Sequence, residues 1–326
     1  MNNYSALQRF LHRSVLSSQL MREIMFDVEK SIFLKKDNNF DDGHVFVAGL
    51  ARSGTTILLN AIYQSDQFAS LTYDDMPFIL APNFWKKISP RKSHGKLQER
   101  AHGDSIRVST NSPEAFEEVF WKTFTDKSII RDELFIKFIS LILKKNNKTR
   151  YLSKNNQNIR RLDLISEIFP RSIILIPFRD PLQHAFSLYS QHMKFVKEQS
   201  EDSFIRDYMK WIGHSEFGLD YKMIHPSNLL YPNEKEFNHW LEQWYLTYKT
   251  VLELSAEHGE FYLIGHESLC NNPKVWVNVK DLLGINQEIK FLFKESKKVI
   301  GQSFDNNLYD KCYRLYESLV AKSFGT

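Results

Sequence analysis

The segment from Val45 to Ile62, VFVAGLARSGTTILLNAI, constrains the fold more than any other part of the chain. Its first residues are apolar and β-branched, two glycines follow at positions 49 and 54, and an apolar helical pattern begins after Thr56. A short buried strand, a tight glycine turn and a helix are the opening of an α/β unit. Such a turn directs backbone N–H groups at an anion where the helix begins. The segment therefore predicts an α/β fold with an anion site.

The glycine turn has the spacing of the nucleotide-binding loop GxxxxGK[ST] but lacks its lysine. Thr55 stands at the lysine position, and Arg52 is the only basic side chain inside the loop. In enzymes of nucleoside triphosphates, the lysine contacts the β- and γ-phosphates and the next hydroxyl binds magnesium. A triphosphate is therefore a poor fit, although a P-loop kinase of a small substrate remains an alternative. Taken alone, the motif is equally compatible with a chance glycine-rich turn.

Strand and helix patterns alternate along the rest of the chain. SIILIPF is a second buried strand that leads into a helix after Pro181, and FYLIGHESL is a third strand followed by a loop. FIKFISLILKKNNK and FNHWLEQWYLTYKTVLELSAEHG show helical apolar spacing. This alternation predicts a three-layer, P-loop-like α/β/α fold with a mainly parallel sheet and ligands at the C-terminal ends of its strands. We expect one domain over residues 43–326, preceded by a helical segment over residues 1–42.

Charge and cysteine usage exclude several classes of protein. The formal net charge is only +4, far from the dense positive charge of a general nucleic-acid binder, so we expect no nucleic-acid partner. Cys270 and Cys312 are the only cysteines and have no CxxC spacing. They fit a reducing compartment, with a single bridge between them left open.

No stretch approaches the roughly 18 apolar residues that a spanning helix needs, and the N-terminus lacks a signal-like apolar core. We therefore expect a cytoplasmic protein. The first forty residues carry an amphipathic helical pattern with interspersed Arg and Lys. This pattern predicts a helix that either packs on the domain or makes peripheral contact with a membrane.

The stretch IILIPFRDPLQHAFSLYSQH contains a second candidate anion contact. Arg179 ends the buried strand, and Ser187 lies eight residues later, after the start of a helix. A strand end and the first turns of the next helix can bring a guanidinium and a hydroxyl onto one anion. The planar fork of arginine suits a phosphate.

The two motifs together resemble the sulfotransferases that use 3'-phosphoadenosine 5'-phosphosulfate (PAPS). In that family the first loop, close to RSGTT in many members, holds the 5'-phosphosulfate, and the second motif, Arg-[Asp/Asn]-Pro with a later Ser, holds the 3'-phosphate. The resemblance implies that the 5' end is bound by Arg52, Ser53, Gly54, Thr55 and Thr56. It implies that the 3'-phosphate is bound by Arg179 and Ser187, with Asp180, Pro181 and Tyr189 completing the motif.

Two weaker motifs extend the resemblance from Val45 to about Gly284. YLSKNN is similar to the family's Lys-Asn/Thr-Pro step, and HESLCNNP with VWVNVKDLLGI is similar to its Tyr-Glu-Asp-Leu…Pro…Leu-Gly ending.

PAPS has no β,γ-phosphate tail that calls for lysine and magnesium, so we expect no metal. Arg52 stands where many cytosolic members have lysine, as in Golgi and several bacterial branches. This departure argues against a small-phenol enzyme of the animal cytosolic type.

The reaction that the resemblance implies is in-line sulfuryl transfer to a hydroxyl or amine, which needs charge stabilisation on the leaving phosphate and a base for the acceptor. Arg52, the loop amides, Thr55 and Thr56 are candidates for the leaving-group side. Lys154 is a further candidate, unless it is an ordinary solvated loop lysine.

Several residues compete for the role of base. Asp75 in QFASLTYDDMPF, with Asp74 beside it, aligns best with the acidic base of tyrosylprotein sulfotransferases; alternatively, both acids cap a helix that starts near Pro77. His102 is a rival because imidazole serves as base in other branches, and the other rivals are Glu117 and Glu118. Their alternatives are a surface turn for His102 and solvated helix positions for the glutamates.

The acceptor remains open among a small metabolite, a glycan or lipid-linked saccharide, and a peptide tyrosine. A non-catalytic member of the fold that binds an anionic partner is a third function to test. Nothing in the sequence indicates the oligomeric state.

Overall fold

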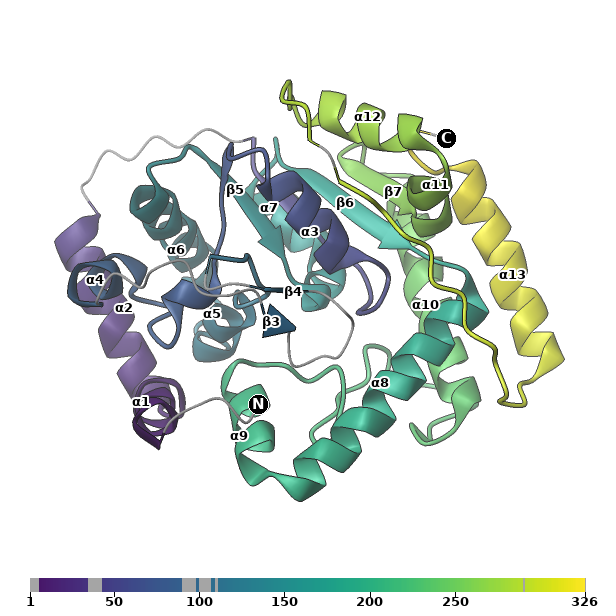
Figure 1. Cartoon of the computed structure of the whole chain (residues 1–326), viewed down its shortest axis with the longest axis horizontal. Helices are drawn as coiled ribbons and strands as arrows, with labels where there is room; N and C mark the ends of the chain where they lie inside the picture. The colour runs from purple at the N-terminus through teal and green to yellow at the C-terminus, as the bar shows by residue number, and fades with distance from the viewer. Residues whose placement is uncertain are drawn as a thin grey trace.

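A five-stranded parallel sheet forms the centre of the molecule (Figure 1). The computed structural model describes residues 6–34, 43–89, 98–99, 107–108, 111–289 and 291–325. In order across the sheet, the strands are β2 (Phe68–Ala69), β5 (Arg150–Lys154), β1 (Val45–Val47), β6 (Ile173–Phe178) and β7 (Phe261–Gly265). All neighbouring pairs are parallel. A separate antiparallel pair is formed by β3 (Gln98–Glu99) and β4 (Arg107–Val108).

Helices cover both faces of the sheet because side chains alternate along each buried strand. In β1, Phe46 belongs to one apolar core, whereas Val45 and Val47 belong to the other. The core around Phe46 is closed by α6 (Arg131–Asn146), α10 (Phe237–Leu254) and α13 (Asn306–Ala321), and the core around Val45 by α3 (Thr55–Tyr63) and α12 (Pro273–Leu282). The predicted three-layer α/β/α fold is confirmed.

Two N-terminal helices, α1 (Ala6–Leu16) and α2 (Gln19–Phe33), pack against the rest of the chain. Phe26 of α2 is fully buried against Phe120, Phe124 and Phe138. The opposite face of the two helices exposes Leu7, Phe10, Leu20, Ile24 and Ile32. Membrane contact through this face, and a domain boundary at residue 42, remain predictions. Within the described parts of the chain, no helix combines the length and apolarity needed to cross a membrane.

The remaining helices connect these layers. They are α4 (Pro82–Ile88), α5 (Glu118–Thr123), α7 (Leu162–Ile168), α8 (Pro181–Glu201), α9 (Ser203–Trp211) and α11 (His266–Asn271), with the 3-10 turns η1 (Tyr73–Asp75) and η2 (Asn156–Arg160). As predicted, α8 begins at Pro181, where the Asp180 side chain caps it by accepting from Gln183 N. Both cysteines are free thiols.

The C-terminal ends of four parallel strands meet at one edge of the sheet. β1 leads into the loop from Ala48 to Gly54, β5 ends at Lys154, β6 is followed by Arg179, and β7 is followed by His266. A strap of residues 291–304 then runs from the α12 side of the molecule across α8 to α13 (Figure 1). This edge is where an α/β sheet of this kind binds ligands.

Candidate functional site

The loop from Ala48 to Gly54 has a backbone that only particular residues allow. A Cβ at Gly49 would lie 3.0 Å from Pro177 O and 3.0 Å from Ser53 Oγ, so glycine lets the loop pack against β6. Gly54 has φ 102° and stands at the N-terminus of α3. Arg52 has φ 71°, which is uncommon for a residue with a side chain and is found most often at functional sites.

Arg52 joins the first motif to the second. Its Nε donates to Ser187 Oγ of α8 at 3.1 Å, across 135 residues of sequence. Ser187 is buried, and Arg52 is half-buried. The two residues that the sequence assigns to opposite ends of one ligand therefore lie in direct contact.

His184 fixes the loop against α8. Its Nε2 donates to Ala51 O at 2.8 Å, and the side chain is fully buried. Burial lowers the pKa of His184 from its usual 6.5 to about 3, with the Ala51 carbonyl opposing that shift. The imidazole is neutral at physiological pH, so one ring nitrogen carries a proton for this hydrogen bond. His184 thus holds the loop at the residue that precedes Arg52.

Arg179 lies at the end of β6 with part of its hydrogen-bonding capacity unused. One terminal nitrogen donates to Ser296 O of the strap, and Nε lies 3.8 Å from Glu267 Oε1 without a hydrogen bond. The residue is only 9% exposed. A buried guanidinium N–H without a partner is costly unless a ligand accepts from it. Arg179 is therefore suited to an anion.

The strap is fastened beside Arg179. Gln183 Nε2 donates to Lys298 O at 2.9 Å, and Lys298 N donates to Gln183 Oε1 at 2.8 Å. This pair of bonds holds a lysine-containing segment at the first turn of α8. This long-range contact was not predictable from the sequence.

The end of β5 lies beside the loop as well. Lys154 pairs with Val47 in the sheet and is buried, which excludes the solvated loop lysine that was its alternative. Thr55 Oγ1 donates to Asn156 Oδ1 at 3.2 Å, two residues beyond Lys154. The predicted residues Arg52, Ser53, Gly54, Thr55, Thr56, Lys154, Arg179 and Ser187 accordingly share one edge of the sheet.

His266 forms another wall of this edge. A Cβ at Gly54 would lie 2.9 Å from His266 Nδ1, so the imidazole packs directly on the N-terminus of α3. Burial, together with the charge of Arg179, lowers the pKa of His266 to about 4. His266 is thus a neutral side chain beside Arg179.

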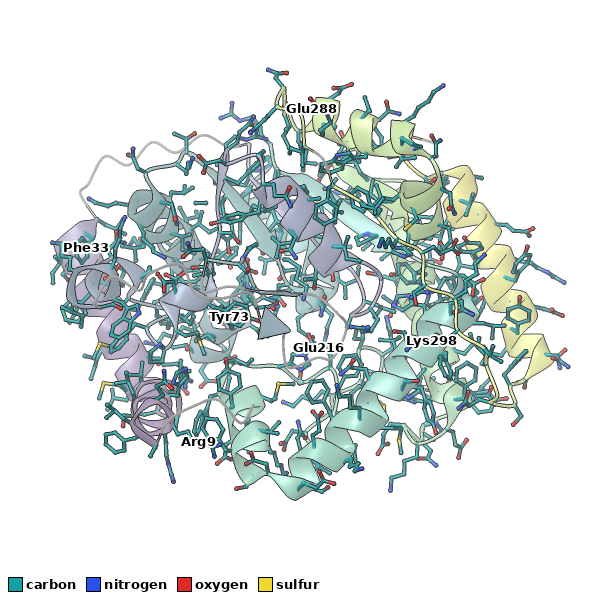
Figure 2. The ribbon with its side chains drawn as sticks, viewed as in Figure 1. Arg9, Phe33, Tyr73, Glu216, Glu288 and Lys298 are labelled. Carbon is teal, nitrogen blue, oxygen red and sulfur yellow. The ribbon has the colours of Figure 1, made fainter. Side chains whose placement is uncertain are left out.

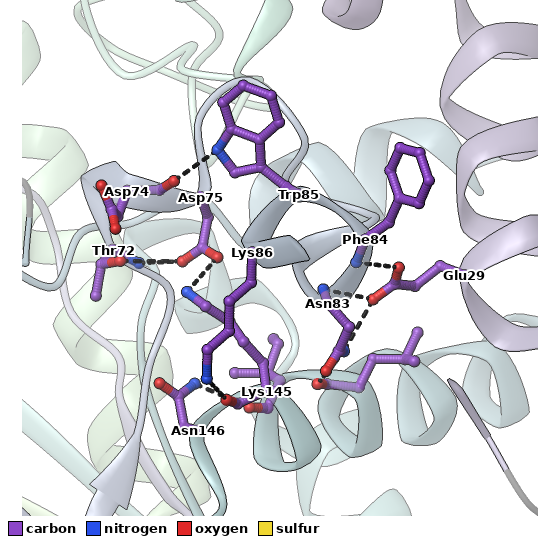
Figure 3. Close-up of polar contacts among 12 residues, drawn as sticks. Glu29, Thr72, Asp74, Asp75, Asn83, Phe84, Trp85, Lys86, Lys145 and Asn146 are labelled. Atoms are coloured by element: carbon purple, nitrogen blue, oxygen red, sulfur yellow. Dashed lines mark hydrogen bonds and ion pairs between the residues drawn. The ribbon is translucent and has the colours of Figure 1, made fainter. Parts of the chain in front are cut away.

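Asp75 has a structural role on a different part of the chain (Figure 3). Its Oδ2 accepts from Thr72 N at 2.8 Å and from Thr72 Oγ1 at 3.1 Å, and its Oδ1 pairs with Lys145 Nζ at 2.6 Å. The carboxylate therefore caps η1 rather than a helix that starts near Pro77. Asp74 is exposed, and its backbone carbonyl accepts from Trp85 Nε1. A role for Asp75 as base stays a prediction, and both of its oxygens have partners.

The glutamate rivals are also occupied. Glu117 is buried and accepts hydrogen bonds from Tyr151, Ser153, Trp121 and Asn158. Glu118 is held by both terminal nitrogens of Arg161, at 2.8 and 2.9 Å, and by Asn155 Nδ2 at 2.9 Å. Burial raises the pKa of Glu118, against the effect of Arg161. His102 lies outside the described residues.

A pocket opens against the loop, between α8, α10 and the segment that follows α9. Leu50 and Ala51 form its loop side, and Asn156 and Glu216 also line it. The pocket is partly open to solvent. Figure 2 shows Glu216 near the centre of the view, between the end of α9 and α8. The pocket therefore adjoins the loop that precedes Arg52.

His184, His266 and Glu216 were not predicted from the sequence. His184 lies three residues before Ser187, so both share one face of the same helix, and this spacing was a usable signal. His266 directly follows a predicted strand, where parallel sheets collect ligand contacts. Glu216 lies between helices with no motif around it, and only the folded chain brings it to the loop.

Three solved structures align with the chain: sulfotransferase STF9 from Mycobacterium avium (TM-score 0.48, 10% identity, 97% of this chain and 79% of that one), sulfotransferase STF1 from Mycobacterium tuberculosis H37Rv (0.47, 11%, 97% and 87%), and the sulfotransferase domain from the curacin biosynthetic pathway (0.42, 12%, 86% and 99%). No curated protein sequence matches significantly.

A model of the sulfotransferase family matches residues 44–230, which is more than half of the 326-residue chain. The match includes the glycine loop, the end of β5 and the segment from Arg179 to Ser187. This chain belongs to the sulfotransferase family.

Proposed function

We propose that this sulfotransferase uses PAPS as donor and transfers its sulfuryl group to a hydroxyl or amine of an acceptor. The observation that carries the proposal is the 3.1 Å hydrogen bond between Arg52 Nε and Ser187 Oγ, since it joins two anion-binding motifs into one site. PAPS has anionic groups at both its 5' and 3' ends. Two adjacent cationic motifs fit such a donor better than a single phosphate loop does.

The residues present fit the donor. The N-terminus of α3, the hydroxyls of Thr55 and Thr56 and the guanidinium of Arg52 supply donors for the 5'-phosphosulfate. Arg179, whose Nε pairs with Glu267 but makes no hydrogen bond within the described residues, and Ser187 supply donors for the 3'-phosphate. When bound, PAPS supplies an activated sulfuryl group. Arg52 and the loop amides stabilise the charge that develops on the leaving phosphate, and Lys154 is a further candidate for that role.

A thermal-shift comparison tests the donor. Adenosine 3',5'-bisphosphate, the product left after transfer, is expected to raise the melting temperature more than ATP or GTP with magnesium, because ligands that bind only the folded state stabilise it by mass action. A larger shift with ATP and magnesium would favour a small-substrate kinase instead. Bisphosphate binding without transfer of radiolabelled sulfate to any acceptor in a broad panel would favour a non-catalytic, anion-binding member of the fold.

For the acceptor, only the reacting group is proposed, a hydroxyl or an amine. A small metabolite, a glycan, a lipid-linked saccharide and a tyrosine-containing peptide each carry such a group. A cytoplasmic location, an absence of nucleic-acid partners and a reaction without a metal also remain expectations from the sequence.

A further inference from the structure

We infer that Glu216 is the base that deprotonates the acceptor hydroxyl. We also infer that the acceptor is a compact apolar or aromatic alcohol. Both parts rest on the proposed function. Glu216 is the only carboxylate among the described residues that line the pocket beside Leu50 and Ala51. It therefore faces the space next to the loop that would hold the phosphosulfate.

The availability of its oxygens distinguishes Glu216 from the acids that the sequence favoured. Its side chain is only 10% exposed, and its buried Oε2 accepts no hydrogen bond from the described residues, although His214 Nδ1 lies 3.1 Å away. By contrast, each oxygen of Asp75, Glu117 and Glu118 has a partner. A nearly buried carboxylate with accepting capacity to spare is suited to receive a proton.

The walls of the pocket indicate the kind of acceptor. Leu50, Ala51, Leu188, Ile224 and Trp240 present apolar surface. The polar groups of two other wall residues are already engaged: the Gln243 amide bonds both backbone groups of His225, and the Tyr221 hydroxyl contacts His239 Nε2 at 2.9 Å. Apart from Asn156 and Lys222, which also line the pocket, these walls offer few free polar groups to the many hydroxyls of a saccharide, whereas a phenol or alkyl alcohol has a single hydroxyl to satisfy.

The acceptor O–H gives its proton to the Glu216 carboxylate, and the acceptor oxygen forms a bond to the sulfur of PAPS. The bond between that sulfur and the 5'-phosphate oxygen breaks, and its electron pair stays on the phosphate. The products are the sulfated acceptor and adenosine 3',5'-bisphosphate, and the proton passes from Glu216 to solvent.

The test measures transfer of radiolabelled sulfate from PAPS to 2-naphthol, 1-octanol and chitotetraose. We expect turnover of the naphthol or the octanol and a fall in kcat of about 100-fold or more in Glu216→Gln, with bisphosphate affinity unchanged. Glu201→Gln is the matched control, because Glu201 ends α8 with its side chain 65% exposed. A second variant, Ile224→Trp, fills the pocket and is expected to raise KM for the apolar acceptor without weakening bisphosphate binding.

Three outcomes would overturn the inference while bisphosphate still binds. They are a kcat of Glu216→Gln within threefold of the wild type, transfer to chitotetraose alone, and no transfer to either apolar acceptor. A wild-type protein that does not bind the bisphosphate would instead refute the proposed donor. The failure of this inference and the failure of the proposed function are thereby distinguishable.

Discussion

Arg52 is the side chain on which the proposed chemistry depends most. Its left-handed backbone, at φ 71°, is enforced by a loop that packs against β6 at Gly49 and against His184 at Ala51. This conformation allows the guanidinium to reach Ser187. This backbone strain lowers the stability of the fold, and the surrounding contacts offset it, as is common at functional sites.

Substitutions at the two partners are expected to separate catalysis from binding. Arg52→Ala should lower kcat by about 10²- to 10³-fold because it removes a preorganised charge from the leaving group. Ser187→Ala should weaken adenosine 3',5'-bisphosphate binding about tenfold, as expected for the loss of one hydrogen bond, with little effect on kcat. Steady-state kinetics and calorimetry measure both. Lys249→Ala, on the exposed side of α10, serves as control, and unchanged turnover in Arg52→Ala would remove this residue from the mechanism.

Asp75 is expected to affect stability more than turnover. Asp75→Asn weakens the cap at Thr72 and breaks the buried pair with Lys145, so the free energy of unfolding should fall by about 3 kcal/mol. Urea unfolding measures that loss, and kcat of the folded variant should stay near the wild-type value. A large loss of kcat with undiminished stability would restore Asp75 as the base.

Of the two contacts of Asp75, only the one with Thr72 could be predicted from the sequence. Thr72 and Asp75 are three residues apart, so a capping interaction can be read from the pattern. Lys145 is 70 residues away and reaches Asp75 only because α6 packs beside η1. Pairings of this kind depend on tertiary structure, and the same is true of the position of Glu216.

At the scale of elements, the three strands with apolar runs were predictable from the sequence, whereas β5 was not. SIILIPF and FYLIG are mostly buried and rich in apolar residues, several of them β-branched or aromatic, and they contain β6 and β7. β5 includes Ser153 and Lys154, which resemble loop residues in sequence. They are buried in a strand because the fold supplies partners, such as Glu117 for the Ser153 hydroxyl.

The turn between β1 and α3 is expected to tolerate no side chain at its last position. Gly54→Ala places a Cβ 2.9 Å from His266 Nδ1 at φ 102°, so it should destabilise the protein by about 1–3 kcal/mol and weaken bisphosphate binding. Gly259→Ala is the matched control, since no heavy atom lies within 4 Å of its added Cβ. Thermal unfolding and calorimetry compare the two variants, and equal behaviour would mean that the loop adapts without strain.

At the scale of the whole molecule, the buried histidines link stability to pH. The folded pKa of His184 is lowered from 6.5 to about 3, so only the unfolded chain takes up its proton between these values. The stability that His184 contributes is present above pH 6.5 and is lost as pH falls toward 3. At pH 5 this loss amounts to about 2 kcal/mol.

A substitution isolates this contribution. In His184→Gln the amide can still donate to Ala51 O, and the decrease in unfolding free energy between pH 7 and pH 5 should be smaller by about 2 kcal/mol. Urea titrations at the two pH values measure it. An unchanged pH dependence in His184→Gln would show that the site titrates normally.

In the proposed enzyme, two motifs bind opposite ends of one nucleotide. Calorimetric titration with adenosine 3',5'-bisphosphate and with 5'-AMP, which lacks the 3'-phosphate, tests this most directly. In the wild type the bisphosphate should bind more tightly than 5'-AMP. Arg179→Ala should bring the ratio of the two dissociation constants close to one. Arg52→Ala should weaken the binding of both ligands and leave that ratio unchanged. A preference that survives in Arg179→Ala would contradict the account, because the 3'-phosphate would then be bound elsewhere.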